Sequence, residues 1–167
     1  SGLVLSQVES TAISLFVSML VLVLLTRRLG QSLVVILPVG LAGAWVVGAM
    51  AMLGINWNVL TIMITALTIG LGIDYSIHVW RRIEANRSSG MGTWEAMRDM
   101  YSTTGTALLL SAGTTICGFM VLLLSPIPVI QDFGIVSSIS VLFSLVMALL
   151  VLPGLLAAEF RTSGDYA

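Results

Sequence analysis

Charged residues divide this sequence into uncharged apolar runs that are long enough to cross a lipid bilayer. A helix of about 20 residues spans the ~30 Å hydrocarbon core of a membrane. One run extends from Leu29 to Ile73 and another from Met100 to Gln131 without a charge. Only 9% of the 167 residues are charged, whereas a soluble domain carries about a quarter. The sequence therefore predicts an integral membrane protein.

The apolar runs predict an all-α, polytopic membrane bundle that forms a single domain over residues 1–167. The long run after Leu29 exceeds one span, and glycine, asparagine and tryptophan between Gly54 and Asn58 predict a turn that splits it. We expect five transmembrane helices, at about residues 8–27, 32–53, 59–82, 103–124 and 131–158.

A short polar interval between the third and fourth spans predicts one further helix, at about residues 93–101. A serine- and glycine-rich loop precedes it, and Thr93 is a candidate N-cap. Trp94, Met97 and Tyr101 recur at helical spacing. We expect a short amphipathic helix that lies on the cytoplasmic surface of the membrane.

The arginines predict the orientation of the chain. All seven basic residues are arginine, and with five alternating spans they fall on one side, which the positive-inside rule makes cytoplasmic. We therefore expect a multi-pass protein of the plasma (inner) membrane with its N-terminus outside and its C-terminus in the cytoplasm. The chain begins at Ser1 without a visible signal peptide, so we expect either that an upstream segment has been removed or that the end residues are remnants of cloning.

Asp74 is the most costly residue to place in these spans. A carboxylate at membrane depth costs at least ~2.5 kcal/mol, so an intramembrane acid is by default a candidate functional group. No Lys or Arg lies in the middle of any predicted span to pair with it. Gly70 and His78 fall on the same side of the helix at about 100° per residue. Asp74 is therefore a candidate proton-binding group, with His78 as a candidate relay.

Small and hydroxyl-bearing residues on other helix faces are candidates to support Asp74. The opposite part of its helix carries Thr65, Thr68, Gly72 and Ser76, which suit close packing against a neighbour. The fourth span repeats small residues at helical spacing and offers hydroxyls to Asp74 or to a water chain; these candidates are Ser111, Thr114 and Thr115. Ser137, Ser140 and Ser144 do the same in the fifth span. Packing alone is the competing explanation for these stripes, and an interfacial position is the alternative for His78.

Three motifs together resemble the resistance-nodulation-division (RND) superfamily, and most of all its MMPL-type branch of hydrophobe and amphiphile exporters. They are Gly70 with Asp74-Tyr75, Thr114-Thr115 with Gly118-Phe119, and Pro128 with Phe133-Gly134. This branch shares its membrane architecture with Patched, Dispatched and sterol-sensing domains. In the family, each half has six helices and a large outer domain, and the aspartate-tyrosine pair lies in the fourth helix. This chain therefore resembles helices two to six of one half.

The resemblance implies the transmembrane part of a proton-driven exporter of lipids or other hydrophobic or amphiphilic molecules. It makes Asp74 the proton-binding group and Tyr75 its hydrogen-bonding partner, with His78 as relay. Gly70 and the fourth-span hydroxyls would support them. We expect no enzymatic activity, no metal, no nucleic acid and no cofactor besides the proton gradient, with sodium as an alternative coupling ion. The expected partners are membrane lipids or a hydrophobic substrate, and the missing first helix, outer domain and second half, or an oligomer.

Other functions remain open at this point. The leading alternative is a sterol-sensing-like lipid-binding or scaffold module without transport of its own, which the span count fits equally well. A protein-export auxiliary of the same superfamily is another. An intramembrane aspartyl protease needs two membrane aspartates, and Asp74 is the only acid that lies away from the ends of a predicted span.

Overall fold

The computed structural model describes residues 29–55 and 59–162, with a few isolated positions before residue 21. Every element in the two long ranges is helical. In chain order the α-helices are α2 (Leu29–Leu53), α3 (Val59–Ser88), α4 (Thr93–Met100), α5 (Thr106–Met120), α6 (Pro128–Val146) and α7 (Leu152–Thr162). The predicted all-α class is confirmed for these residues.

Within the described residues, four helices are long and apolar enough to cross a membrane. They cover Val34–Leu53, Met63–Ser88, Thr93–Leu124 and Pro128–Ala158. These helices correspond to the second to fifth predicted spans. The first predicted span, residues 8–27, lies outside the described residues apart from isolated positions. The expected total of five is therefore still a prediction.

Two glycines end helices where the chain reverses. Gly54 follows α2 with a φ of 66°, and Gly90 follows α3 with a φ of 92°. This left-handed region is cheap only for glycine, because a Cβ would approach the following carbonyl oxygen. The predicted turn after the second span therefore begins at Gly54, where the Ile55 amide donates to the carbonyl of Met50 at 3.1 Å.

The helix predicted at about residues 93–101 is present, but it is continuous with the fourth span. Helix α4 begins at Thr93 but continues into α5 through a π-helical segment, η1 (Tyr101–Gly105). Its apolar residues Ala96, Met97 and Met100 are buried within the protein, because α4 packs against α3. The N-cap is Gly92, without a side-chain hydrogen bond, so Thr93 is not the cap.

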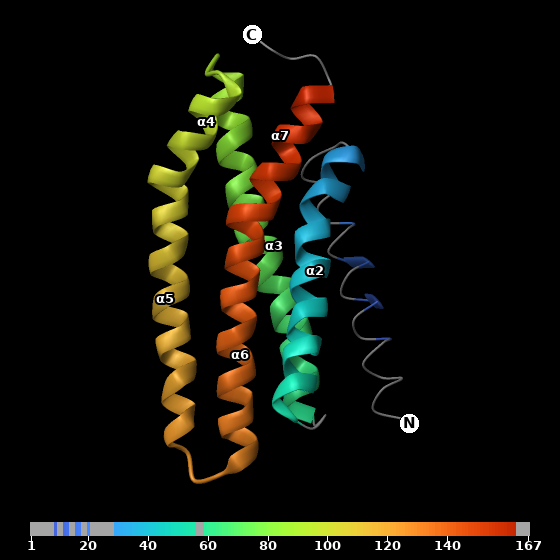
Figure 1. Ribbon diagram of the computed structural model, residues 1–167, viewed down its shortest axis with the longest axis vertical. Coiled ribbons are helices and arrows are strands. Elements are labelled where there is room, and N and C mark those ends of the chain that lie inside the picture. The colour runs from blue at the N-terminus through green and yellow to red at the C-terminus, as the bar shows by residue number, and fades with distance from the viewer. Residues whose placement is uncertain are drawn as a thin grey trace.

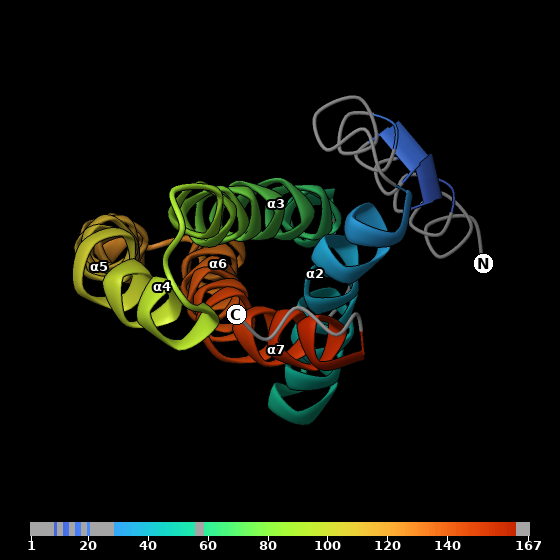
Figure 2. The same cartoon turned by 90° about the horizontal axis from the view of Figure 1, so that it is seen from above.

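Helix α6 occupies the middle of the bundle. It packs against α2, α3 and α5, whereas α5 lies at the outside (Figure 2). Helix α4 and the end of α7 lie at the same end of the bundle, opposite the α5–α6 connection (Figure 1). The largest core cluster joins α2, α3, α6 and α7 and includes Val35, Tyr75, Val79, Leu145 and Leu152.

The motifs around residues 114–119 and 128–134 meet where α5 turns into α6. The Phe119 and Phe133 rings pack edge to face with centroids 6.1 Å apart. A Cβ on Gly134 would lie 2.7 Å from the Phe119 carbonyl oxygen and 3.0 Å from the Leu122 Cβ. Only glycine therefore allows α6 to approach the end of α5 this closely.

A tyrosine from one helix completes the backbone hydrogen bonding of another. Pro153 has no N–H, so it cannot donate to the carbonyl of Leu149, four residues earlier. Leu149 belongs to a π-helical segment, η3 (Met147–Val151), that joins α6 to α7. The Tyr101 hydroxyl, from η1, donates a 2.7 Å hydrogen bond to this carbonyl oxygen. The two π-helical segments are thus linked to each other.

We expect Gly134→Ala to destabilise the bundle by about 1–3 kcal/mol, the usual cost of overpacking a tight contact. The new Cβ meets backbone, which has little room to move. Gly118→Ala in α5 is the matched control, since its Cβ would meet nothing within 4 Å and alanine favours a helix by up to about 1 kcal/mol. Thermal unfolding of the purified protein in detergent compares the two variants, and equal melting temperatures would contradict the close approach.

We expect Tyr101→Phe to cost about 1 kcal/mol of unfolding free energy, because it leaves the Leu149 carbonyl without its donor. In a Pro153→Ala background the new N–H supplies a donor, so the same change should cost less. A double-mutant cycle in reversible unfolding measures this coupling. If Tyr101→Phe costs the same in both backgrounds, the hydroxyl does not replace the missing proline N–H.

Candidate functional site

One face of α3 packs closely against α2 and α6 through small residues. Thr65, Thr68, Gly72 and Ser76 are all buried. A Cβ on Gly72 would lie 3.2 Å from a methyl of Val39 in α2 and 3.6 Å from the Ser144 hydroxyl in α6. Small residues let membrane helices approach closely and gain packing contacts. The predicted packing face is therefore confirmed.

Hydroxyl groups join α3 to α6 across this packed face. The Thr68 hydroxyl hydrogen bonds with that of Ser140 and also contacts the carbonyl of Ile64, 2.7 Å away. The Ser144 hydroxyl donates to the Thr68 carbonyl at 3.4 Å. Ser140 and Ser144 of the fifth predicted span thus contact Thr68, on the side of α3 that faces away from Asp74. The buried Ser137 hydroxyl has no hydrogen-bond partner among the described residues.

The opposite face of α3 is uncovered and carries the predicted site. Gly70, Asp74, His78 and Arg81 are all exposed and recur every three or four residues, so they form one row along the helix. We call these four residues the Asp74 row. A Cβ on Gly70 would meet nothing within 4 Å, which leaves the surface beside the carboxylate open. Figure 2 shows α3 along one edge of the bundle.

Asp74 has no hydrogen bond or ion pair with any residue that the structure describes. Its surroundings differ from the expectation, because the side chain lies on the outside of the bundle rather than among its helices. An acid within a membrane helix almost always faces protein or water rather than lipid. Among the residues that the structure describes, no hydrogen bond or ion pair reaches Asp74 from another helix, and the row stays exposed.

Tyr75 points away from Asp74 into the protein. Its side chain is only 5% exposed and belongs to the largest core cluster, with Val79 and Leu145. The expected hydrogen bond between Tyr75 and Asp74 is not formed. Adjacent residues on a helix differ by about 100° in direction, so packing of one side chain turns the other outward.

The fourth-span hydroxyls do not reach Asp74. Thr114 and Thr115 donate to the carbonyl of Ser111 in their own helix, at 2.8 and 2.9 Å, and Ser111 is exposed. Helix α5 packs on α6 and lies at an outer edge of the bundle (Figure 2). In an apolar helix a Ser or Thr hydroxyl readily bonds its own backbone. Their predicted support of Asp74 is therefore wrong within this bundle.

A polar cluster that sequence reasoning missed attaches α4 to α3. Arg82 forms an ion pair with Asp99, with a nitrogen and an oxygen 2.8 Å apart. The buried Asn86 amide donates to the same Asp99 oxygen at 2.6 Å and to the Ala96 carbonyl at 3.3 Å. The sequence signal for this cluster was the four-residue spacing of Arg82 and Asn86, which places both side chains on one face of a helix. This cluster fixes α4 beside the end of α3 that carries the arginines.

The helices and the intramembrane acid together define a multi-pass membrane protein. The sequence profile of the MMPL family matches residues 6–162, and the chain belongs to this family. The resemblance to the RND superfamily and its MMPL-type branch is thereby confirmed.

Three curated relatives span archaea, bacteria and vertebrates. The chain is 35% identical to "Putative membrane protein MJ1562" of Methanocaldococcus jannaschii over 93% of its own length and 40% of the relative. It is 27% identical to "Probable transport protein MmpL4" of Mycobacterium leprae, over 93% of its length and 17% of the relative. It is 28% identical to protein patched homolog 1 of Danio rerio, over 76% and 11% respectively. The chain thus spans less than half the length of each of these relatives.

We expect Asn86→Ala to loosen α4 from α3. The change removes two hydrogen bonds from a buried side chain, at a cost of about 1–2 kcal/mol. Amide hydrogen exchange of Thr93–Met100 should accelerate about 5–30-fold if α4 opens locally. Ser88→Ala is the control, since that hydroxyl only bonds the carbonyl of Ala85 in its own helix. Unchanged exchange in Asn86→Ala would mean that apolar packing alone holds α4.

Proposed function

We propose that this chain forms the membrane part of a proton-driven exporter of lipids or other hydrophobic or amphiphilic molecules. The observation that carries this proposal is Asp74, an exposed and unpaired acid in a helix long and apolar enough to span a membrane. Membership of the MMPL family and the likeness to a relative named as a transport protein support it. The proposal assigns no enzymatic reaction, metal or nucleic acid to the chain.

Asp74 would couple proton binding to a change in helix packing. A carboxylate carries a charge when deprotonated and none when protonated, so the two forms differ strongly in how they are accommodated away from water. A surface packed against the Asp74 row would therefore take one arrangement with the charge present and another without it. His78, one turn along the same row, would pass the proton toward the arginine-bearing end.

The second side of this site would come from another set of helices. The chain spans 40% of one relative and 17% of another, which leaves room for a second half and an outer domain in the whole protein. A second half or a second copy of the chain would cover the Asp74 row. The open surface at Gly70 suits the approach of such a helix or of water. The hydroxyls of Ser111, Thr114 and Thr115 would then contribute only to α5 and not to the proton site.

Tyr75 would position Asp74 through its packing and would not be its hydrogen-bonding partner within this half. Its packing in the core fixes the rotation of α3 and so keeps Asp74 on the outer face. Sodium is an alternative coupling ion, since carboxylate and hydroxyl oxygens also bind hard cations.

The proposed location is the plasma membrane, with the arginine-bearing end in the cytoplasm. Arg81, Arg82 and Arg98 lie near the end of the bundle that carries α4 (Figure 1), as the positive-inside rule requires for one orientation. The N-terminus would then lie outside and the C-terminus inside.

A lipid-binding or scaffold module of the sterol-sensing type is the second candidate. The matches to patched homologs from Danio rerio and Homo sapiens favour it. Such a module does not need to bind and release a proton. Whether Asp74 must bind a proton for activity therefore distinguishes the two functions.

We expect Asp74→Asn to abolish proton-coupled export by the whole protein while leaving it folded. Asparagine keeps the shape of the side chain but binds no proton, and Asp74 has no described partner to lose. Proteoliposomes with an imposed pH gradient and an internal pH-sensitive dye report proton movement, and a fluorescent amphiphile reports export. Asp132→Asn, in the first turns of α6 at the opposite end of the bundle, is the matched control.

Thermal unfolding of the same preparations shows whether Asp74→Asn is folded. A folded variant with full proton-coupled export would overturn the exporter proposal. Export that follows an imposed sodium gradient, with no proton movement, would mean that sodium and not the proton is the coupling ion. Lipid binding that is unchanged by Asp74→Asn, together with no export by the unmodified protein, would favour the sterol-sensing-type module.

A further inference from the structure

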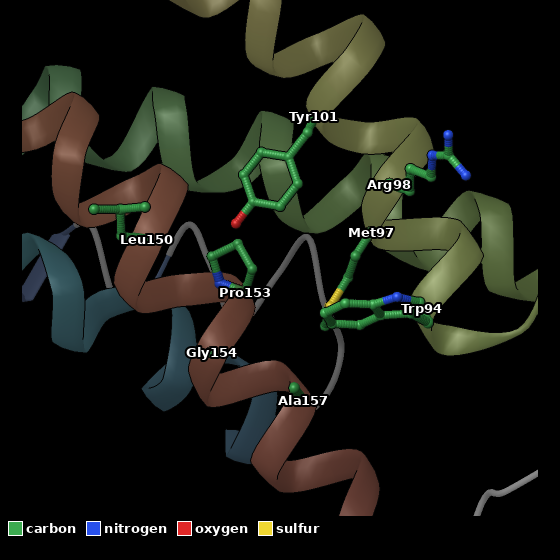
Figure 3. Close-up of a pocket in the computed structure, with 8 residues that line it drawn as sticks. All are labelled: Trp94, Met97, Arg98, Tyr101, Leu150, Pro153, Gly154 and Ala157. Carbon is green, nitrogen blue, oxygen red and sulfur yellow. The ribbon is translucent and has the colours of Figure 1, made fainter.

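A cavity of about 440 Å³ lies between α4 and α7, away from the Asp74 row. Trp94, Met97 and Tyr101 line it from one side, and Leu150, Pro153 and Ala157 from the other (Figure 3). Its volume falls within the roughly 300–1,000 Å³ of small-molecule sites. Gly154 also belongs to the lining. Because glycine has no side chain, α7 leaves space in the cavity at this position.

An exposed apolar stripe along α6 and η3 leads directly into this cavity. Leu142, Val146 and Leu150 are 48%, 37% and 65% exposed and recur every four residues, so they lie on one side of the helix. Gly154 continues the same spacing and is exposed too. In a protein that spans a bilayer such a stripe contacts lipid tails. The cavity is thus an extension of the surface that lipid tails already cover.

Arg98 gives the rim of this apolar cavity a positive charge. It is the one charged residue in the lining, and it is exposed and has no ion pair within the described part of the chain. The neighbouring Asp99 carboxylate pairs with Arg82 and accepts a hydrogen bond from Asn86. It therefore does not neutralise Arg98. Figure 3 shows the Arg98 guanidinium at the outer edge of the site.

The residues around the cavity are of the types found at the level of the lipid headgroups. Trp94 is 83% exposed at its rim, and tryptophan is enriched where the membrane meets water. The site belongs to the arginine-bearing end of the bundle (Figure 1). Basic pockets between membrane helices on the cytoplasmic side bind anionic lipid headgroups.

We propose that this cavity binds an anionic phospholipid, with its phosphate on Arg98 and one acyl chain between Tyr101 and Leu150. The apolar walls match a hydrocarbon chain, and the exposed stripe through Val146 continues the path of that chain along the outside of the bundle. The free guanidinium selects a net negative headgroup over a zwitterionic one. This lipid site is separate from proton binding at Asp74 and stands whether or not the chain exports lipids.

The test uses the whole protein in nanodiscs of phosphatidylcholine that contain photoactivatable phosphatidylglycerol or photoactivatable phosphatidylcholine. The photoreactive group sits on the acyl chain, and mass spectrometry locates the labelled peptides. We expect phosphatidylglycerol to label residues 94–101 and 150–157 about fivefold more than phosphatidylcholine does, which is the effect of one arginine on an anionic lipid.

Two variants and two matched controls separate the headgroup from the acyl chain. Arg98→Gln should remove the preference for phosphatidylglycerol, and Arg81→Gln, exposed at the same end, should keep it. Gly154→Leu should fill the cavity and remove labelling by both lipids. Gly113→Leu, on α5, should not, although neither glycine has an atom within 4 Å of its Cβ position.

Equal labelling by the two lipids, or labelling that persists in a folded Gly154→Leu variant, would overturn the proposal. So would crosslinks from this cavity to another segment of the protein in place of lipid, because the cavity would then be an internal contact. Thermal unfolding of each variant establishes that it is folded before labelling is compared.

Discussion

The close packing of α3 against α2 and α6 determines how the rest of this structure is arranged. Gly72 brings α3 within contact distance of Val39 and Ser144, and Thr68 joins it to Ser140 by a hydrogen bond. Because a helix is rigid, fixing one face also fixes the direction of the other. The contacts of Thr68 and Gly72 on the inside are therefore the reason that Asp74 and His78 are on the outside. The position of the acid follows from residues that never touch it.

The helices and the acid were predictable from the sequence, but the neighbours of each helix face were not. Apolar runs bounded by charges located the spans of α2, α3, α5 and α6, because the thickness of a bilayer sets their length. Helical projection placed Asp74 and Thr68 on different faces of α3. It did not show which helix packs on which face of α3. Ser111 was therefore predicted to support Asp74, whereas the hydroxyls that contact α3 come from α6 and bond Thr68. Which helices are neighbours depends on the whole bundle, and a single helix sequence does not contain that information.

The two sides of α3 also differ in their roles: one side stabilises the bundle, and the other carries the proposed functional group. The buried side, with Tyr75 and Gly72, holds this bundle together through packing and hydroxyl contacts. The Asp74 row contributes no contact to the described bundle, so it is free to interact differently with whatever covers it. Family membership fits this division, because the chain spans only part of its relatives. The proposed proton site and the proposed lipid cavity lie on different helices, so a change at one need not disturb the other.

The hydrogen bond from Tyr101 to the Leu149 carbonyl has a consequence for how the protein is made. Pro153 leaves that carbonyl without a donor from its own helix, and an unsatisfied backbone group in a bilayer is costly. Tyr101 precedes Leu149 by 48 residues, so the donor is synthesised before the acceptor. The order of residues along the chain thus lets the Leu149 carbonyl find its donor in a helix that has already been made.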